Sequence, residues 1–277
     1  MDTGTPIGFR FLRQAQQEDE WPWFAEHYHE APQHILDFIA GDELSVEGLK
    51  VADIGCGDGI IDLGLMELGA PRQLVGFDLL ETDTDELLQA ARQNGVELTT
   101  LPPELEFRVN HGTTVPAADG EFDALVSWST FEHVDDPVGL LTEMRRIVRD
   151  DGFLFLQIWP LYWSEHGSHL WAWYPDGYAQ LDHDAAEIEE RLRTDHPDRA
   201  ADVDFVLDEF RNLNRITADQ LQRALLAAGW SISKFELLTG ATHVRPNHAR
   251  RPLSELGVSG IKLLAVPAVR SPAGSTS

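Results

Sequence analysis

The sequence predicts an α/β fold in which helices cover both faces of a mostly parallel sheet. An apolar run at about 49–54 leads directly into the glycine turn 55–59 (Gly-Cys-Gly-Asp-Gly), after which a helix is expected. A second apolar run, 74–77, ends in Asp78. A strand, a helix and a second strand in this order are typical of one parallel strand–helix–strand unit, so the sheet is expected to begin here.

Periodicity and turn residues predict the other elements along the chain. The expected helices cover about 23–39, a segment starting near Gly59, 140–148, 184–193, 202–213 and 216–229. Further strands are expected at 122–127, 153–158, 231–238 and 260–266, with a turn at Asp151-Gly152. The chain therefore divides into an N-terminal helical segment (1–48), a main domain (49–268) with an insertion at about 160–215, and a disordered tail (269–277).

The composition limits the kinds of partner and the compartment. With 21 basic and 47 acidic residues the formal net charge is −26, and such a surface repels phosphate backbones, so DNA and RNA are not expected as partners. The single cysteine, Cys56, excludes an intrachain disulfide and a zinc site built on several cysteines. No apolar stretch is long enough to cross a membrane, and residues 1–10 lack the apolar core of a secretory signal. The expected compartment is the cytoplasm.

The glycine turn and the two acidic strand ends indicate the kind of ligand. A dinucleotide fingerprint needs Gly-x-Gly-x-x-Gly, whereas here Ile60 stands at the last glycine position. Asp53 adds negative charge beside the turn, which disfavours a pyrophosphate and favours an ammonium group. Asp78 can accept hydrogen bonds from ribose hydroxyls. The pattern therefore favours a positively charged nucleoside without phosphate, and S-adenosylmethionine has these properties.

Segment 53–59 closely resembles motif I of the class I S-adenosylmethionine-dependent methyltransferases, and 74–78 resembles the strand that follows it in that family. The resemblance covers about 49–159, including 122–134, and resumes at 216–230. It implies a Rossmann-like, seven-stranded, mostly parallel sheet with an antiparallel last strand, and S-adenosylmethionine as the cofactor. The residues that it assigns to cofactor binding are Asp53, Gly55, Cys56, Gly57, Gly59, Asp78, Leu79, Asn110, His111, Ser127 and Trp128.

One position departs from the family pattern. In many relatives an Asp after the third strand hydrogen-bonds the adenine amino group, and here that place falls at His111. Asn110 or His111 could accept the adenine hydrogen bond instead. The N-terminal helix also has two interpretations, because in relatives such helices often lie across the cofactor site but can also simply pack on the sheet edge.

The insertion after the fifth strand is expected to hold the methyl acceptor, since ligands in open α/β sheets bind outside the carboxyl ends of the strands. Its first part, 159–175, is rich in Trp, Tyr and His. The predicted substrate residues are Tyr162, Trp163, His166 and His169. The alternative is a lid core in which these aromatics only bury area. The acceptor is expected to be a small molecule or glycan, methylated at oxygen, with nitrogen or carbon left open.

A hydroxyl acceptor gains from a nearby base, and the candidates are His133, His166 and His169. His133 matches a histidine common in relatives, where it can also serve helix packing. The pair His166 and His169 raises the question of a metal, but two ligands without a third are weak support, so no metal is predicted. Two other functions stay open: a nicotinamide-dependent oxidoreductase, disfavoured by Ile60 and Asp53, and a non-catalytic cofactor-binding subunit.

Overall fold

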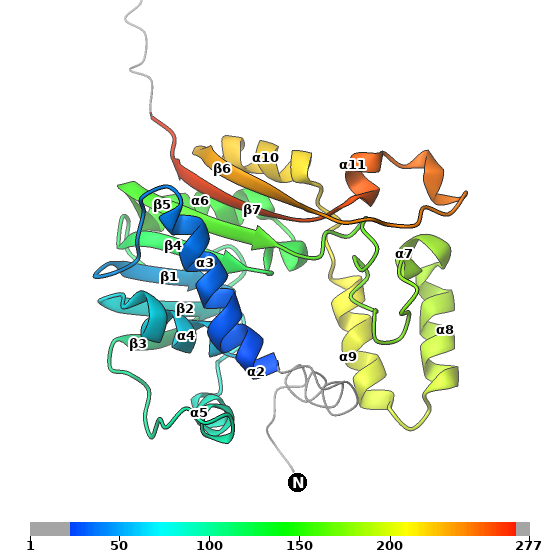
Figure 1. The fold of residues 1–277 in the computed structure, drawn as a ribbon, viewed down its shortest axis with the longest axis horizontal. Helices are drawn as coiled ribbons and strands as arrows, with labels where there is room; N and C mark the ends of the chain where they lie inside the picture. The colour runs from blue at the N-terminus through cyan, green and yellow to red at the C-terminus, as the bar shows by residue number, and fades with distance from the viewer. Residues whose placement is uncertain (1–22, 270–277) are drawn as a thin grey trace, which may run out of the picture.

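The computed structural model describes residues 23–269, and the expected tail and the start of the N-terminal segment lie outside these residues, apart from position 269. One seven-stranded sheet has the order β3-β2-β1-β4-β5-β7-β6 (Figure 1). Its strands are β1 (Lys50–Ile54), β2 (Gln73–Asp78), β3 (Leu105–Val109), β4 (Phe122–Trp128), β5 (Val148–Ile158), β6 (Trp230–Thr239) and β7 (Val258–Pro267). The pairs among β1 to β5 are parallel, and β7 is antiparallel to both of its neighbours. The predicted fold class is confirmed.

The helices follow the predicted order. Before and within the first half of the sheet they are α2 (Trp23–Ala25), the π-helix η1 (Glu26–Glu30), α3 (Ala31–Ala40), α4 (Ile60–Gly69), α5 (Thr84–Gln93), the 3₁₀ helix η2 (Phe131–His133) and α6 (Pro137–Ile147). The later ones are α7 (Ala179–Asp182), α8 (Ala185–Asp195), α9 (Ala200–Arg211), α10 (Ala218–Ala227), η3 (His248–Arg250) and α11 (Leu253–Leu256). None of these helices is both long and apolar enough to cross a membrane.

Side chains that alternate along each strand bury both faces of the sheet. In β1, Val51 packs in the cluster that contains α3, α4 and α5, whereas its neighbour Ala52 packs in the cluster that contains α6 and α10. Strands of a parallel sheet that are covered on both faces show such continuous apolar runs. This double covering leaves the strand ends as the only part of β1 and β4 that a ligand can reach.

The predicted turn at Asp151-Gly152 is wrong, because both residues lie within β5. The pairing of β4 with β5 is irregular here: Phe122 stands opposite Val148, but Ala124 stands opposite Phe153. The extra residues of β5 bulge, and Gly152 lies so close to the Asp123 carbonyl that a Cβ would come to 2.5 Å from it. The glycine was therefore a signal of a bulge and not of a chain reversal.

The insertion forms a lid with its own hydrophobic core. Buried side chains of α8 and α9 pack with Tyr162, Leu170 and Tyr174 in a cluster separate from the two sheet clusters. Figure 1 shows α7, α8 and α9 beside the ends toward which β4 and β5 point. The lid is tied to the sheet at both ends, because the Leu161 amide donates to the Ser259 carbonyl (2.8 Å) and the Asn214 amide to the Glu132 carbonyl (2.8 Å).

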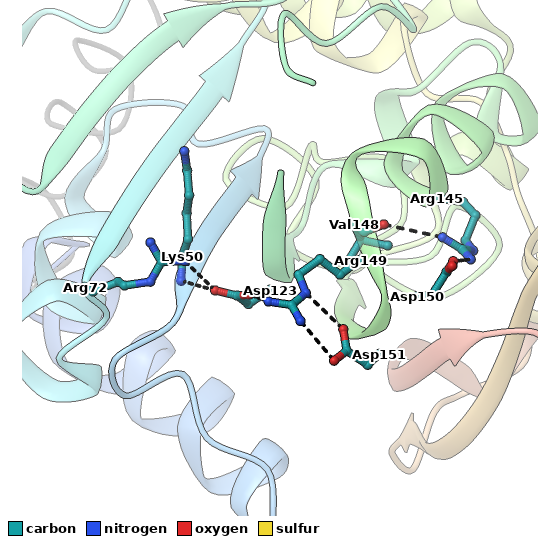
Figure 2. Close-up of polar contacts among 8 residues, drawn as sticks. All are labelled: Lys50, Arg72, Asp123, Arg145, Val148, Arg149, Asp150 and Asp151. Atoms are coloured by element: carbon teal, nitrogen blue, oxygen red, sulfur yellow. Dashed lines mark hydrogen bonds and ion pairs between the residues drawn. The ribbon is translucent and has the colours of Figure 1, made fainter. Parts of the chain in front are cut away.

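The opposite, amino-terminal ends of the strands are joined by charge around Asp123 (Figure 2). Its carboxylate accepts hydrogen bonds from the Lys50 amide (2.8 Å), Arg72 (2.8 Å) and Arg149 (3.0 Å). Burial alone would raise the pKa of Asp123, but these hydrogen bonds and the two guanidinium charges hold it below its ordinary value. Asp123 thereby connects β1, β4 and β5 with the residue that precedes β2.

We expect Asp123→Asn to lower the free energy of unfolding by about 1–3 kcal/mol at neutral pH, because it removes the negative charge between Arg72 and Arg149 and leaves Arg149 with Asp151 as its carboxylate partner. Because the pKa of Asp123 is lower in the folded than in the unfolded chain, its contribution to stability is fully present above the ordinary pKa of 3.8. That contribution is lost as the pH falls through the lower folded value. Denaturant unfolding of both proteins should therefore show the difference shrinking in acid.

Asp150→Asn is the matched control, because the Asp150 side chain is 94% exposed although it also pairs with an arginine, Arg145 (Figure 2). Its effect should stay within about 0.5 kcal/mol. Equal losses in the two variants would contradict the structural importance of Asp123.

Candidate methyl-donor and acceptor site

Two of the three glycines in the turn at the end of β1 differ in their surroundings. Gly55 (φ +86°) and Gly57 (φ +54°) both have positive φ, which favours glycine. A Cβ on Gly55 would lie 2.2 Å from the Thr130 side chain, whereas a Cβ on Gly57 would meet nothing within 4 Å. Gly55 therefore permits close packing, and the backbone at Gly57 borders open space.

Asp78, at the end of β2, is held beside this open part of the turn. One carboxylate oxygen accepts from the Gly57 amide (3.0 Å) and the other from the Leu80 amide (3.2 Å). Leu79, which lies between Asp78 and Leu80 in the chain, is 61% exposed. The predicted pairing of the glycine turn with Asp78 is thus present in space, and the side chain has lone pairs left for a ligand.

Asp53 is more buried than an ammonium ligand would suggest, at 1% exposure, and Oδ1 has no hydrogen-bond partner. Burial raises the pKa of Asp53 to about 7, with a further contribution from the Asp78 charge. Burial also raises the pKa of Asp62, on α4, well above its ordinary value. Both carboxyl oxygens of Asp62 are likewise buried without a hydrogen-bond partner.

Of the two candidates for the adenine contact, Asn110 has the better position. Its backbone amide donates to the Asp78 carbonyl (2.8 Å), and the side chain is 5% exposed. Its Nδ2 donates to the Gly112 carbonyl (3.2 Å), which leaves Oδ1 as an acceptor without a partner. The His111 side chain is exposed, and its backbone pairs with Thr114.

Three other predicted cofactor residues make contacts within the protein. The fully buried Ser127 hydroxyl donates to the Ile54 carbonyl (2.8 Å), at the end of β1. Trp128 stacks on Phe155 with ring centroids 6.3 Å apart. Cys56 is buried, and burial raises the pKa of its thiol well above the ordinary value, so the thiol is neutral. None of these side chains needs a ligand to complete its contacts.

The N-terminal helix reaches the glycine turn and also packs on the sheet. Trp23 Nε1 donates to Asp58 Oδ2 (3.2 Å), and the indole stacks on His27 at 3.6 Å. Farther along, Ile35 and Phe38 of α3 are buried in the sheet cluster. The helix is therefore packed on the sheet and also contacts the glycine turn through Trp23, a residue that the sequence pattern did not single out.

The four predicted acceptor residues fall into two groups. Tyr162 and Trp163 line a pocket of about 430 Å³ between the lid and the segment that precedes β7. Arg251 lies 3.3 Å over the Trp163 ring and Arg215 lies 5.0 Å over the Tyr162 ring, and both arginines also line the pocket. The other lining residues are Gln180, Leu181, His183, Asp184, Ala185, Phe210, Asn247 and His248.

The three predicted histidines, His133, His166 and His169, are not among the residues that line this pocket. His169 in the lid meets His133 of η2 edge to face, with ring centroids 5.0 Å apart. His166 lies apart from this pair, with its ring 6.5 Å from the Trp171 ring. Neither Nδ1 of His166 nor Nε2 of His169 has a hydrogen-bond partner. The lid thus brings His133 and His169 together. This contact could not be predicted from the sequence, because the two residues are far apart in the chain.

Residues 52–156, which contain the glycine turn, Asp78 and η2, match the family described as "Methyltransferase domain". The chain carries a class I methyltransferase domain. A curated relative, the ubiquinone biosynthesis O-methyltransferase of Xanthomonas oryzae pv. oryzae (strain PXO99A), is 32% identical over 122 residues, which cover 44% of this chain and 47% of that protein. The chain therefore spans about half the length of the curated relatives it matches.

Solved structures extend the likeness of the methyltransferase domain to the whole fold. A chain in the complex of the Haloferax volcanii Trm112 methyltransferase activator with a methyltransferase has a TM-score of 0.55 at 17% identity, covering 96% of this chain and 100% of that one. The [4+2]-cyclase SpnF has a TM-score of 0.53 at 17% identity, covering 86% and 81%. The fold is thus shared by proteins whose reactions differ.

The contrast between the glycines of the turn gives a stability prediction. An alanine at either position must adopt an unfavourable positive φ, which costs about 1–2 kcal/mol of stability. Only Gly55→Ala also places a methyl group against the Thr130 side chain. We expect denaturant unfolding to show Gly55→Ala less stable than Gly57→Ala by at least about 1 kcal/mol. Gly48→Ala, with φ +70° and no atom within 4 Å of its Cβ, is the control for backbone strain alone. Equal stability of all three would contradict the close contact.

Proposed function

We propose that this protein transfers a methyl group from S-adenosylmethionine to an oxygen atom of a small-molecule acceptor, in the cytoplasm. The observation that carries the proposal is the arrangement of Asp78 beside the open backbone of Gly57. A carboxylate fixed by two amides is well placed to accept from both ribose hydroxyls. The open space beside Gly57 admits a ligand that any Cβ would hinder.

The rest of the donor site follows from the acceptors that lack partners. Asn110 Oδ1 is proposed to accept from the adenine amino group, and Asp53 to face the ammonium side of the donor. The donor is positively charged, so it compensates the cluster of carboxyl groups around the turn. A pyrophosphate would add negative charge there, which is why methyl transfer is preferred to nicotinamide chemistry.

The acceptor is proposed to bind in the pocket lined by Tyr162 and Trp163. Its volume of about 430 Å³ fits a small molecule. The guanidinium groups of Arg215 and Arg251 favour an acceptor with an anionic group or an aromatic ring. Arg215 follows Asn214, whose side chain donates to the carbonyls of Phe131 (2.6 Å) and Val134 (2.8 Å), so the pocket wall is linked to η2.

Oxygen is proposed as the methylated atom because the curated relatives are named as O-methyltransferases. Transfer is a displacement at the methyl carbon: the acceptor oxygen forms the new bond, the carbon–sulfur bond breaks, and the sulfonium leaves as a neutral thioether. The acceptor proton must go to a base, and His133, His166 and His169 are the proposed acceptor-side residues. Incubation with donor and candidate acceptors, followed by mass spectrometry for the gain of one methyl group, tests the reaction and distinguishes it from cyclase-like chemistry and from a non-catalytic subunit.

Donor binding should depend on Asp78. Asp78→Ala removes a charged acceptor and should weaken S-adenosylmethionine binding by about 1.5–3 kcal/mol, or tenfold to about a hundredfold in Kd. Isothermal titration calorimetry measures the change. Glu104→Ala removes an equal charge from an exposed position just before β3, at the opposite ends of the strands, and should leave Kd unchanged. Unchanged affinity in Asp78→Ala would argue against this donor site.

Acceptor recognition should depend on Trp163, which lines the pocket, and not on aromatic residues elsewhere in the protein. Trp163→Ala removes a pocket wall and the ring under Arg251, so we expect the acceptor KM to rise at least about tenfold while the donor Kd stays constant. Phe235→Ala, on the exposed edge of β6, is the matched control and should change neither constant. A change in donor affinity alone would place the acceptor elsewhere.

A further inference from the structure

A cluster of ligating side chains lies where η2 meets the lid. Glu132, His133 and His169 each offer one oxygen or nitrogen atom, and these atoms all lie within 4.8 Å of one another. Glu209 of α9 extends the cluster, with Oε2 3.6 Å from His133 Nε2. Two imidazoles and one or two carboxylates thus converge from three elements.

The carboxylate of Glu132 lacks the partner that its burial demands. The side chain is 3% exposed, and Oε2 has no hydrogen-bond partner. Burial raises the pKa of Glu132 to about 8, with a smaller contribution from Glu209. A buried carboxyl oxygen without a hydrogen bond or cation is costly, so the position of Oε2 is better explained by a bound partner than by packing.

His169 presents a free nitrogen to the same point. The Pro160 carbonyl hydrogen-bonds the His169 ring, while Nε2 has no partner. A carbonyl accepts, so this contact keeps the proton on Nδ1 and leaves the lone pair of Nε2 available. An imidazole oriented by a backbone carbonyl through its other nitrogen is the usual arrangement of a metal-binding histidine.

We propose that Glu132, His133 and His169 bind a divalent transition-metal ion, with Glu209 as a further ligand. Imidazole and carboxylate together suit zinc, manganese, cobalt or iron(II), whereas magnesium and calcium prefer oxygen ligands alone. Metal–ligand bonds of about 2.0–2.2 Å require the ligand atoms to draw slightly closer than they are here. The His133 side chain is 26% exposed, which leaves the ion a route from solvent.

This inference revises the sequence expectation that no metal binds. That expectation rested on the pair His166 and His169, for which no third ligand was evident. The structure leaves His166 out of the cluster and supplies Glu132 and His133 in its place. Metal binding at this cluster does not depend on the proposed function.

The test is a zinc titration of chelator-treated protein by calorimetry, in millimolar magnesium so that exposed carboxylates of this acidic chain are already occupied. We expect one zinc ion per chain. Glu132→Gln, His133→Gln and His169→Gln should each weaken zinc binding by at least about tenfold. Cobalt(II) absorption, which reports nitrogen ligands, should change in the same three variants.

His166→Gln is the matched control and should bind zinc like the natural chain. Thermal unfolding checks that each variant folds, and the partly exposed His133 decides the outcome if the buried Glu132→Gln variant does not fold. Zinc binding that is absent, or that persists unchanged in His133→Gln and His169→Gln, overturns the proposal. The titration uses neither donor nor acceptor, so its failure leaves the proposed methyl transfer standing, and a failed transfer assay leaves the metal site standing.

Discussion

The close contact between Thr130 and Gly55 is the constraint on which the rest of the site depends. The Thr130 hydroxyl donates to the Gly55 carbonyl (3.2 Å), and only a residue without a Cβ allows this approach. Because β1 and β4 are adjacent and parallel, the contact fixes where the chain leaves β4. The donor-side turn and the η2 residues Glu132 and His133 therefore belong to one rigid corner of the sheet.

Carboxyl groups at the two ends of the sheet have pKa values that are shifted in opposite directions. Asp123, at the amino ends, is ionised because it has an amide and two guanidinium groups as partners. Asp53, Asp62 and Glu132, at the carboxyl ends, have no comparable cation within the described part of the chain, and burial raises the pKa of each. Ion pairs with Arg72 and Arg149 stabilise the amino-terminal end, whereas the carboxyl groups at the other end lack such a partner among the described residues. A cationic donor beside Asp53 would favour the ionised form of that residue.

Much of the fold could be predicted because its signals are local. The apolar runs of β1, β2 and β4 and the glycine turn lie within short windows, and Asp78 directly follows one of these runs. The miss at Asp151-Gly152 shows the limit of local signals. Asp-Gly favours a turn in isolation, but pairing with β4 and the space beside the Asp123 carbonyl turn it into a bulge, and neither is visible within a window of the sequence.

The site was harder to predict than the fold because its residues meet only through tertiary contacts. Asp62 did leave a signal, since an acid stands among apolar residues at the start of α4. Glu132 left none, and although His133 and His169 were singled out separately, their meeting was not predicted, because they come from different elements that the lid brings together. The Asn214 side chain donates to the carbonyls of Phe131 and Val134, on either side of Glu132 and His133. The position of η2 is therefore fixed in part by the far end of the lid, so the cluster of Glu132, His133 and His169 depends on both segments and not on either one alone.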